Sequence, residues 1–146
     1  MLNFADGTSF TSGHAKYLDQ GAQAGEGSAK IFVRIAPEGF GGPVLAQLDT
    51  GAAWSVLNAE IAEALGLLGG DGEQIKIGTR EGVVDGRLED ATLTLLAQHG
   101  ESVVVNARVF VSREWQGQTF LGYMGLLERI RFALDPQAND FYFGSY

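Results

Sequence analysis

Apolar and polar residues alternate along several short stretches of the chain, and this period of two predicts β-strands. KIFVRIA (30–36) places Ile31, Val33 and Ile35 on one face. SVVVNARVFVS (102–112) alternates in the same way over a longer run. Further strands are predicted at 44–49, 73–78, 83–96, 119–122, 131–135 and 141–145. Strands at such short spacing favour antiparallel pairing, so the fold class is predicted to be mainly β.

One stretch has the helical period instead, NAEIAEALGLL (58–68). Asn58 is a good N-cap, and Glu60 suits the positive end of the helix dipole in the first turn. Gly66 provides a C-terminal stop. A further helical turn or two is predicted in YMGLLERI (123–130).

The polar stretch TREG separates the strands predicted at 73–78 and 83–96, which indicates a hairpin with a polar tip. Along the second arm the apolar positions change parity between residues 84–88 and 91–95. Because a one-residue slip moves side chains to the opposite face, this change predicts a bulge or bend near residues 89–90.

The start of the chain follows neither the period of two that is typical of strands nor the period that is typical of helices. Residues 1–28 contain five glycines among small and polar residues, so we expect a flexible Gly-rich N-terminal arm before a domain spanning 29–146. GAQAGEGSAK (21–30) is rich in glycine, as a phosphate-binding loop is, but it lacks the G-K-[ST] ending and the preceding strand of such a loop. We therefore interpret this stretch as a linker.

Composition narrows the possible partners. The chain has 10 Lys+Arg and 18 Asp+Glu, a net charge of −8, which argues against nucleic acid. No apolar run is long enough for a membrane span, and the first residues lack the features of a signal peptide. With no cysteine the chain has no disulfides, and these observations together predict a soluble cytoplasmic protein.

Several familiar catalytic sites are absent from the sequence. The only histidines, His14 and His99, lie far apart and do not form a paired zinc motif, so we expect no metal site and no cofactor. The G-x-S-x-G pattern of many serine hydrolases does not occur either. The aromatic cluster FYFGSY (141–146) indicates packing rather than base stacking, given the acidic charge.

The remaining candidate is LDTGAAWSVL (48–57), where Asp49 stands between apolar residues. Asp-Thr-Gly by itself is compatible with an ordinary turn. The stretch around it resembles the signature of the single-domain, retroviral-type (retropepsin-like) aspartic proteases of the pepsin-like superfamily. Residues 48–52 match its apolar-Asp-Thr-Gly-Ala, and residues 55–57 match the following Ser/Thr and apolar pair.

Downstream features strengthen the resemblance. Phe120-Leu121-Gly122, the stretch 123–130 and a strand ending at Asp135 are similar to the closing order of that family. The resemblance covers about residues 29 to 146 and implies a closed antiparallel β-barrel-like retropepsin fold. It also implies one or two short helices and a flap hairpin.

The resemblance also implies roles for individual residues. Asp49 would be catalytic, and Thr50, Gly51, Ala52 and Ser55 would support the active-site loop. The flap tip would be Thr79, Arg80, Glu81 and Gly82, and Leu121 and Gly122 would pack the second loop. Ala52, where pepsins have serine, would favour a working pH closer to neutral.

One Asp-Thr-Gly in a chain too short for two lobes predicts a homodimer, with one Asp49 from each protomer on the two-fold axis. The function predicted is therefore hydrolysis of a peptide or protein substrate by an aspartic endopeptidase.

Two departures from the family pattern keep alternatives open. Tyr123-Met124 stands where many members have Arg followed by Asp or Asn, and the hairpin tip is more polar than the viral tips. A dimeric peptide- or protein-binding module with the same fold and little activity is the main alternative. A small β domain in which Asp-Thr-Gly is only a turn is the other.

Overall fold

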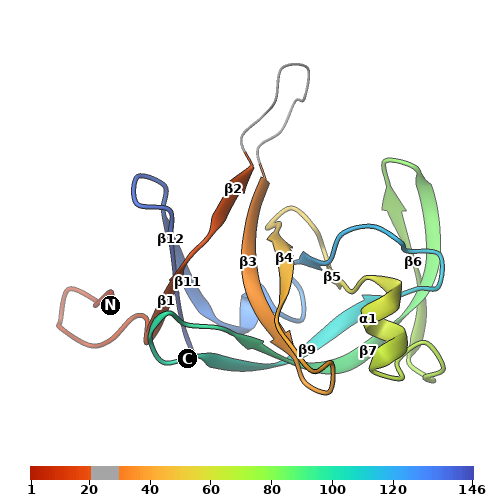
Figure 1. Cartoon of the computed structure of the whole chain (residues 1–146), viewed down its shortest axis with the longest axis horizontal. Helices are drawn as coiled ribbons and strands as arrows, with labels where there is room; N and C mark the ends of the chain where they lie inside the picture. The colour runs from red at the N-terminus through yellow and green to blue at the C-terminus, as the bar shows by residue number, and fades with distance from the viewer. Residues whose placement is uncertain (21–29) are drawn as a thin grey trace.

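A closed six-stranded barrel forms the body of the molecule. The structure is a computed structural model that describes residues 1–20 and 30–146. The barrel runs through β3 (Lys30–Pro37), β4 (Val44–Leu48), β10 (Phe120–Leu121), β5 (Ser55–Val56), β9 (Val103–Val111) and β7 (Gly82–Leu95). Pairing of β3 with β7 closes it, with Ile35 opposite Leu95 (Figure 1). The predicted mainly β, barrel-like class is confirmed.

The alternating residues of β9 fill the barrel as predicted. Val103, Val105, Ala107, Val109 and Val111 are all buried, and they pack with Ile35, Leu57, Leu93, Leu95 and Leu121. Burying apolar surface is the main favourable term in folding. The alternate apolar positions of β9 therefore determine both the strand pattern in the sequence and the face that forms the core.

Two of the barrel pairings are parallel, where close spacing predicted antiparallel neighbours. β10 lies parallel to β4, with Leu121 opposite Leu48, and β5 lies parallel to β9. Both involve strands of two residues, which join segments distant in the sequence. The parallel β4–β10 pair makes the loops that follow these two strands leave the barrel at the same end.

The predicted helix and hairpins are present, with shifted ends. α1 (Ala59–Ala64) begins after Asn58, whose side chain accepts from the N–H of Glu60, and it ends before Gly66 with φ +72°. A single turn of 3₁₀ helix, η1 (Leu127–Arg129), occurs in the second helical region. β6 (Glu73–Thr79) and β7 form the long hairpin, and β11 (Arg131–Asp135) and β12 (Asp140–Gly144) form the closing one.

Of the bulge or bend predicted near residues 89–90 of β7, the bulge is wrong. The register of β7 with β9 is unbroken from Arg87 opposite Val111 to Leu95 opposite Val103. The parity of its apolar residues changes because the strand serves two apolar clusters with opposite faces: Leu88 faces one, and Leu93 and Leu95 face the other.

The first twenty residues contain strands that the sequence pattern did not predict. β1 (Gly13–Lys16) pairs with both β12 and β8 (His99–Gly100) in a second sheet of order β11-β12-β1-β8, and β2 (Leu18–Gln20) pairs with β3. Gly13 is needed in β1 because a Cβ there would overlap the carbonyl oxygen of Glu101. The remaining part of the predicted arm and linker, residues 21–29, lies outside the described residues.

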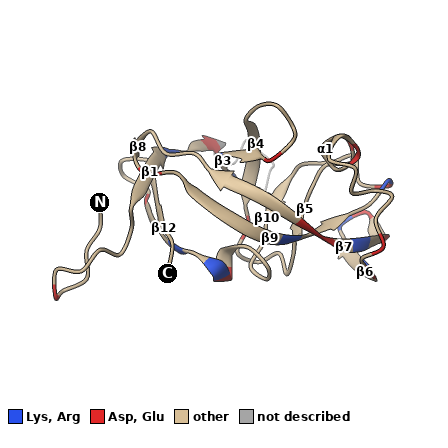
Figure 2. Cartoon of the chain, turned by 90° about the horizontal axis from the view of Figure 1, so that it is seen from below, with Lys and Arg blue, Asp and Glu red and all other residues tan. Residues whose placement is uncertain are grey.

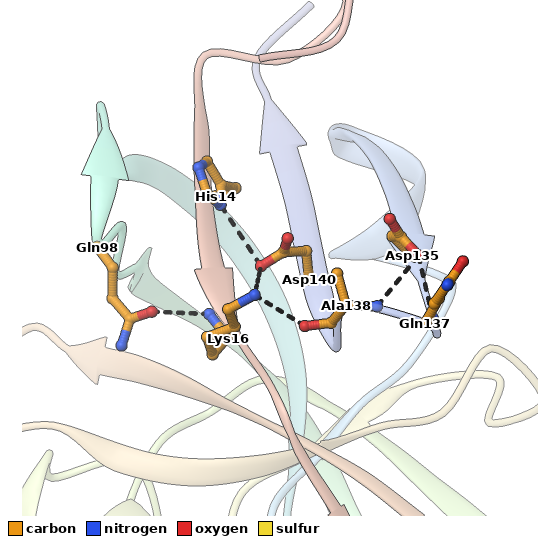
Figure 3. Close-up of polar contacts among 7 residues, drawn as sticks. All are labelled: His14, Lys16, Gln98, Asp135, Gln137, Ala138 and Asp140. Carbon is orange, nitrogen blue, oxygen red and sulfur yellow. Dashed lines mark hydrogen bonds and ion pairs between the residues drawn. The ribbon is translucent and has the colours of Figure 1, made fainter.

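Polar contacts fix β1 on the closing hairpin (Figure 3). The ammonium of Lys16 lies 2.8 Å from Asp140 Oδ1 and donates to the carbonyl oxygen of Ala138 at 2.8 Å. The backbone N–H of Lys16 donates to the side chain of Gln98, and His14 Nδ1 lies 3.7 Å from Asp140 Oδ1. The N-terminal strand is thereby held in the body of the protein.

Charged side chains are dispersed over the described elements. Lys and Arg occur at positions along several different strands and loops (Figure 2). No helix in residues 1–20 and 30–146 is long and apolar enough to cross a membrane.

Candidate active site

Asp49 directly follows β4 and is half-buried. Its backbone N–H donates to the carbonyl oxygen of Leu121 at 3.0 Å, which extends the β4–β10 pairing by one step. Its side-chain Oδ1 accepts from the N–H of Gly51 at 3.0 Å, and its carbonyl oxygen accepts from Ala52 at 3.2 Å. The barrel thus fixes the backbone of Asp49, and its own loop orients the carboxylate.

The residues after Asp49 form a tight loop with an open outer side. Thr50 and Gly51 are exposed, and Ala52 is half-buried. A Cβ at Gly51 would lie 3.3 Å from Asp49 Oδ1, closer than most such contacts, so glycine allows the backbone to approach the carboxylate.

Ser55 and Gly122 connect this loop to the one that follows β10. The hydroxyl oxygen of Ser55, fully buried, accepts from the N–H of Gly122 at 2.9 Å. The N–H groups of Tyr123 and Met124 donate to the carbonyl oxygens of Ala52 and Ala53 at 2.9 and 2.7 Å. The sequence-predicted residues Asp49, Ser55, Leu121 and Gly122 therefore lie together in one hydrogen-bonded unit.

The residues predicted as a flap tip lie at the end of the β6–β7 hairpin. Thr79 donates its hydroxyl to the carbonyl oxygen of Gly82 at 2.8 Å and accepts from the N–H of Glu81 at 3.2 Å. Gly82 has φ +128°, and Arg80 and Glu81 are exposed. In Figure 1 this hairpin and the loop after β4 rise toward the same side of the barrel.

Sequence reasoning assigned no role to Trp54, which lies between Asp49 and Ser55. It packs in an apolar cluster with residues of the β6–β7 hairpin, and a Cβ at Gly125 would lie 3.3 Å from its Cζ3. The sequence did contain one sign of this packing, because Trp54 and Val56 are apolar residues at alternate positions on either side of the buried Ser55. Tyr123 and Met124, noted as departures from the family pattern, are exposed beside the Asp49 loop.

A single chain provides one carboxylate at this site. One half-buried carboxylate can take up or give a proton, but it cannot serve as acid and base in the same step. A surface hollow exists elsewhere, lined by residues including Glu38, Asp90 and Arg129, and none of its lining residues belongs to the Asp49 loop.

Comparisons with known proteins bear on this geometry. Neither a family model nor a curated protein matches the sequence. Among solved structures, the crystal structure of a retropepsin-like aspartic protease from Rickettsia conorii matches over 88% of this chain and 98% of that chain, with a TM-score of 0.53 and 18% identity. The chain has a retropepsin-like fold. In this retropepsin-like barrel, the Asp-Thr-Gly loop leaves the end of β4.

Proposed function

We propose that the chain is a homodimeric aspartic endopeptidase whose catalytic dyad is Asp49 from each of two protomers. The observation that carries the proposal is the position of Asp49 in a retropepsin-like barrel. It follows β4, bonds to β10 through its backbone, and directs its carboxylate to its own loop N–H.

The chemistry requires two carboxylates. Two such groups about 3 Å apart share one proton, because both cannot readily be ionised at that distance. The ionised member takes a proton from water, which attacks the peptide carbonyl carbon. The protonated member stabilises the developing oxyanion, and a proton then passes to the leaving nitrogen as the C–N bond breaks.

The surroundings of Asp49 support an arrangement across a two-fold axis. Thr50 is exposed next to the carboxylate, and its hydroxyl is available to the partner's loop. Tyr123 and Met124, 52% and 42% exposed, provide apolar surface beside it. The β6–β7 hairpin would act as the flap, opening for an extended substrate and then covering it.

A second candidate is a peptide-binding dimer with little hydrolytic activity. The exposed Tyr123 and Met124 favour it, since apolar surface beside the loop binds peptide whether or not the bond is cut.

Cleavage of an unbiased peptide mixture by the wild type and by Asp49→Asn tests the proposal. The substitution keeps the size of the side chain and removes its acid–base function, so we expect cleavage to fall by at least about a thousandfold. Asp71→Asn, in an exposed loop, is the matched control and should keep full activity. A wild type that binds peptides and cuts none from acidic to mildly alkaline pH would support the binding module.

A further inference from the structure

A surface hollow of about 530 Å³ lies on the wall of the barrel, and we name it the wall hollow. Its lining includes Glu38 after β3, Leu65 and Leu67 after α1, Asp90 and Thr92 on β7, and Arg129 of η1. Glu38 precedes β4 and Asp49 follows it, so the wall hollow and the Asp49 loop lie toward opposite ends of this strand (Figure 1). The volume is within the range of sites that bind small ligands.

The wall hollow lies at a gap in the strand pairing of β7. On the side away from β9, β7 pairs with β6 as far as Leu88, which is opposite Glu73, and with β3 from Leu93, which is opposite Pro37. Between these partners, residues 89–92 have no strand on this side within the described part of the chain. A short free sheet edge therefore remains in the barrel wall, and such an edge can pair with another chain.

Backbone groups of β7 are directed into this gap. The carbonyl oxygen of Thr92 faces it, because it accepts from the N–H of Glu38 at 2.9 Å. Residues two apart on a strand direct their backbone groups to the same side, so the N–H and C=O of Asp90 face the wall hollow as well. Four strand residues span roughly 13 Å. An extended peptide of about three residues can therefore add to this edge through main-chain hydrogen bonds.

The charges around the wall hollow favour a cationic ligand. Glu38 and Asp90 provide two exposed carboxylates, and neither forms an ion pair with another described residue. Arg129 brings one positive charge, but its guanidinium donates to the carbonyl oxygen of Asn106. The whole chain has a net charge of −8, which adds to the attraction of a positive group.

The chain after α1 gives the wall hollow an apolar side. Leu65 and Leu67 are half-buried and pack against the barrel core. Both also line the hollow, beside the polar edge of β7. A ligand that combines a cationic group, a peptide backbone and an apolar side chain therefore finds a partner for each part.

The short length of the gap indicates that a chain end binds there. Beyond the gap the edge of β7 is occupied by Glu73 of β6 in one direction and by Pro37 of β3 in the other. A long extended strand would collide with β6 or β3, whereas a peptide that ends inside the gap would not. Glu38 and Asp90 select the amino end, because they attract an ammonium and repel a terminal carboxylate.

We propose that the wall hollow binds the free amino end of a short peptide. The first residues of the peptide pair with the backbone of Asp90 and Thr92, and the α-ammonium is held by the carboxylates of Glu38 and Asp90. An apolar side chain of the peptide rests on Leu65 and Leu67. This binding site is separate from the Asp49 loop and goes beyond the proposed peptidase function.

Backbone amide NMR tests the site, with Asp49→Asn as the protein so that no peptide is cut. The probe is the tripeptide Leu-Leu-Ala with an amidated carboxyl end, used with either a free or an acetylated amino end. We expect the amide signals of Asp90 and Thr92 to shift with the free form. The acetylated form should bind at least about tenfold more weakly, because it lacks the charge that the carboxylates attract.

Substitutions in the same Asp49→Asn protein make the result specific. Glu38→Gln combined with Asp90→Asn keeps the size of both side chains and removes their charges, and both positions are exposed. The preference for the free amino end should then fall to about twofold or less. Glu114→Gln, an exposed carboxylate in the loop after β9, is the matched control and should keep the full preference.

The position of the shifted signals separates this site from the active site. Shifts confined to the amides of Gly51 and Ala52, or equal binding of the two forms of the peptide, would overturn the proposal and leave the peptidase standing. Shifts at Asp90 and Thr92 with a preference for the free amino end, together with a wild type that cuts no peptide, would keep the wall hollow and reject the peptidase.

Discussion

At the scale of single residues, one hydrogen bond joins the two loops of the candidate site. The N–H of Gly122 donates to Ser55 Oγ in a fully buried position. Gly122 lies so close to the chain at Trp54 that a Cβ would overlap its carbonyl group and lie 2.7 Å from the nitrogen of Ser55. The Asp49 loop therefore keeps its shape only if residue 122 has no side chain.

Gly122→Ala tests this contact. Forcing a methyl group into a packed region separates the loops, and we expect the free energy of unfolding to fall by about 1–3 kcal/mol. Chemical denaturation followed by circular dichroism measures it. Gly42→Ala, where a Cβ would meet nothing within 4 Å, is the matched control and should change stability little. Equal stability of the two variants would contradict the close packing of the loops.

The predictable part of the site was the part encoded locally. Asp49, Gly51 and Ala52 belong to a short motif in which the N–H groups of Gly51 and Ala52 donate to Asp49 within the loop. The contact between Ser55 and Gly122 spans 67 positions and depends on a parallel pairing of two-residue strands, for which no local pattern exists. Only the resemblance to a family predicted that these residues lie in one site, because no periodic pattern in the sequence links them.

At the scale of elements, the strands of five or more residues could be predicted, whereas β10 was the only shorter strand that could be. β3, β4, β9, β11 and β12 were predicted to within about two residues at either end. β1 was missed because Gly13 looks like a strand breaker, whereas in the sheet it is selected for close approach to Glu101. The parity change in β7 was recognised, but its cause lies in tertiary packing, since the two faces of the strand serve different apolar clusters.

The ion pair that fixes β1 predicts a dependence of stability on pH. The hydrogen bond from Lys16 lowers the pKa of Asp140 from its ordinary value of 3.8. The positive charges of Lys16 and His14 lower this pKa further, and together these effects outweigh burial, which raises it. Because the folded pKa is lower than the unfolded one, the stabilisation is complete above pH 3.8 and is lost as the pH falls through the folded value.

Urea denaturation from neutral to strongly acidic pH measures this effect. We expect Asp140→Asn to be less stable than the wild type at neutral pH, and the difference should shrink as the pH falls below about 4. Asp71→Asn, with an exposed side chain, should follow the wild type throughout. A constant difference between Asp140→Asn and wild type over this range would contradict the role of the ionised carboxylate.

At the scale of the whole molecule, the closed barrel determines which loops lie together at the candidate site. The parallel β4–β10 pair sends the Asp49 loop and the Gly122 loop out at the same end, and a second apolar cluster, around the buried Val56, Leu88 and Phe110, supports the β6–β7 hairpin beside them. The chain has a single Asp-Thr-Gly motif. A dyad of two carboxylates therefore requires a second copy of the chain, with the site on the symmetry axis.

Mixing wild-type protein with Asp49→Asn under exchange conditions tests the shared dyad most directly. Peptide cleavage per wild-type chain is measured as the inactive variant is added at constant wild-type concentration. If each site needs Asp49 from both protomers, an equal amount of variant should reduce the activity to roughly half by random pairing, and a large excess should abolish it. Activity that stays constant as the variant is added would contradict the account, because each chain would then act alone.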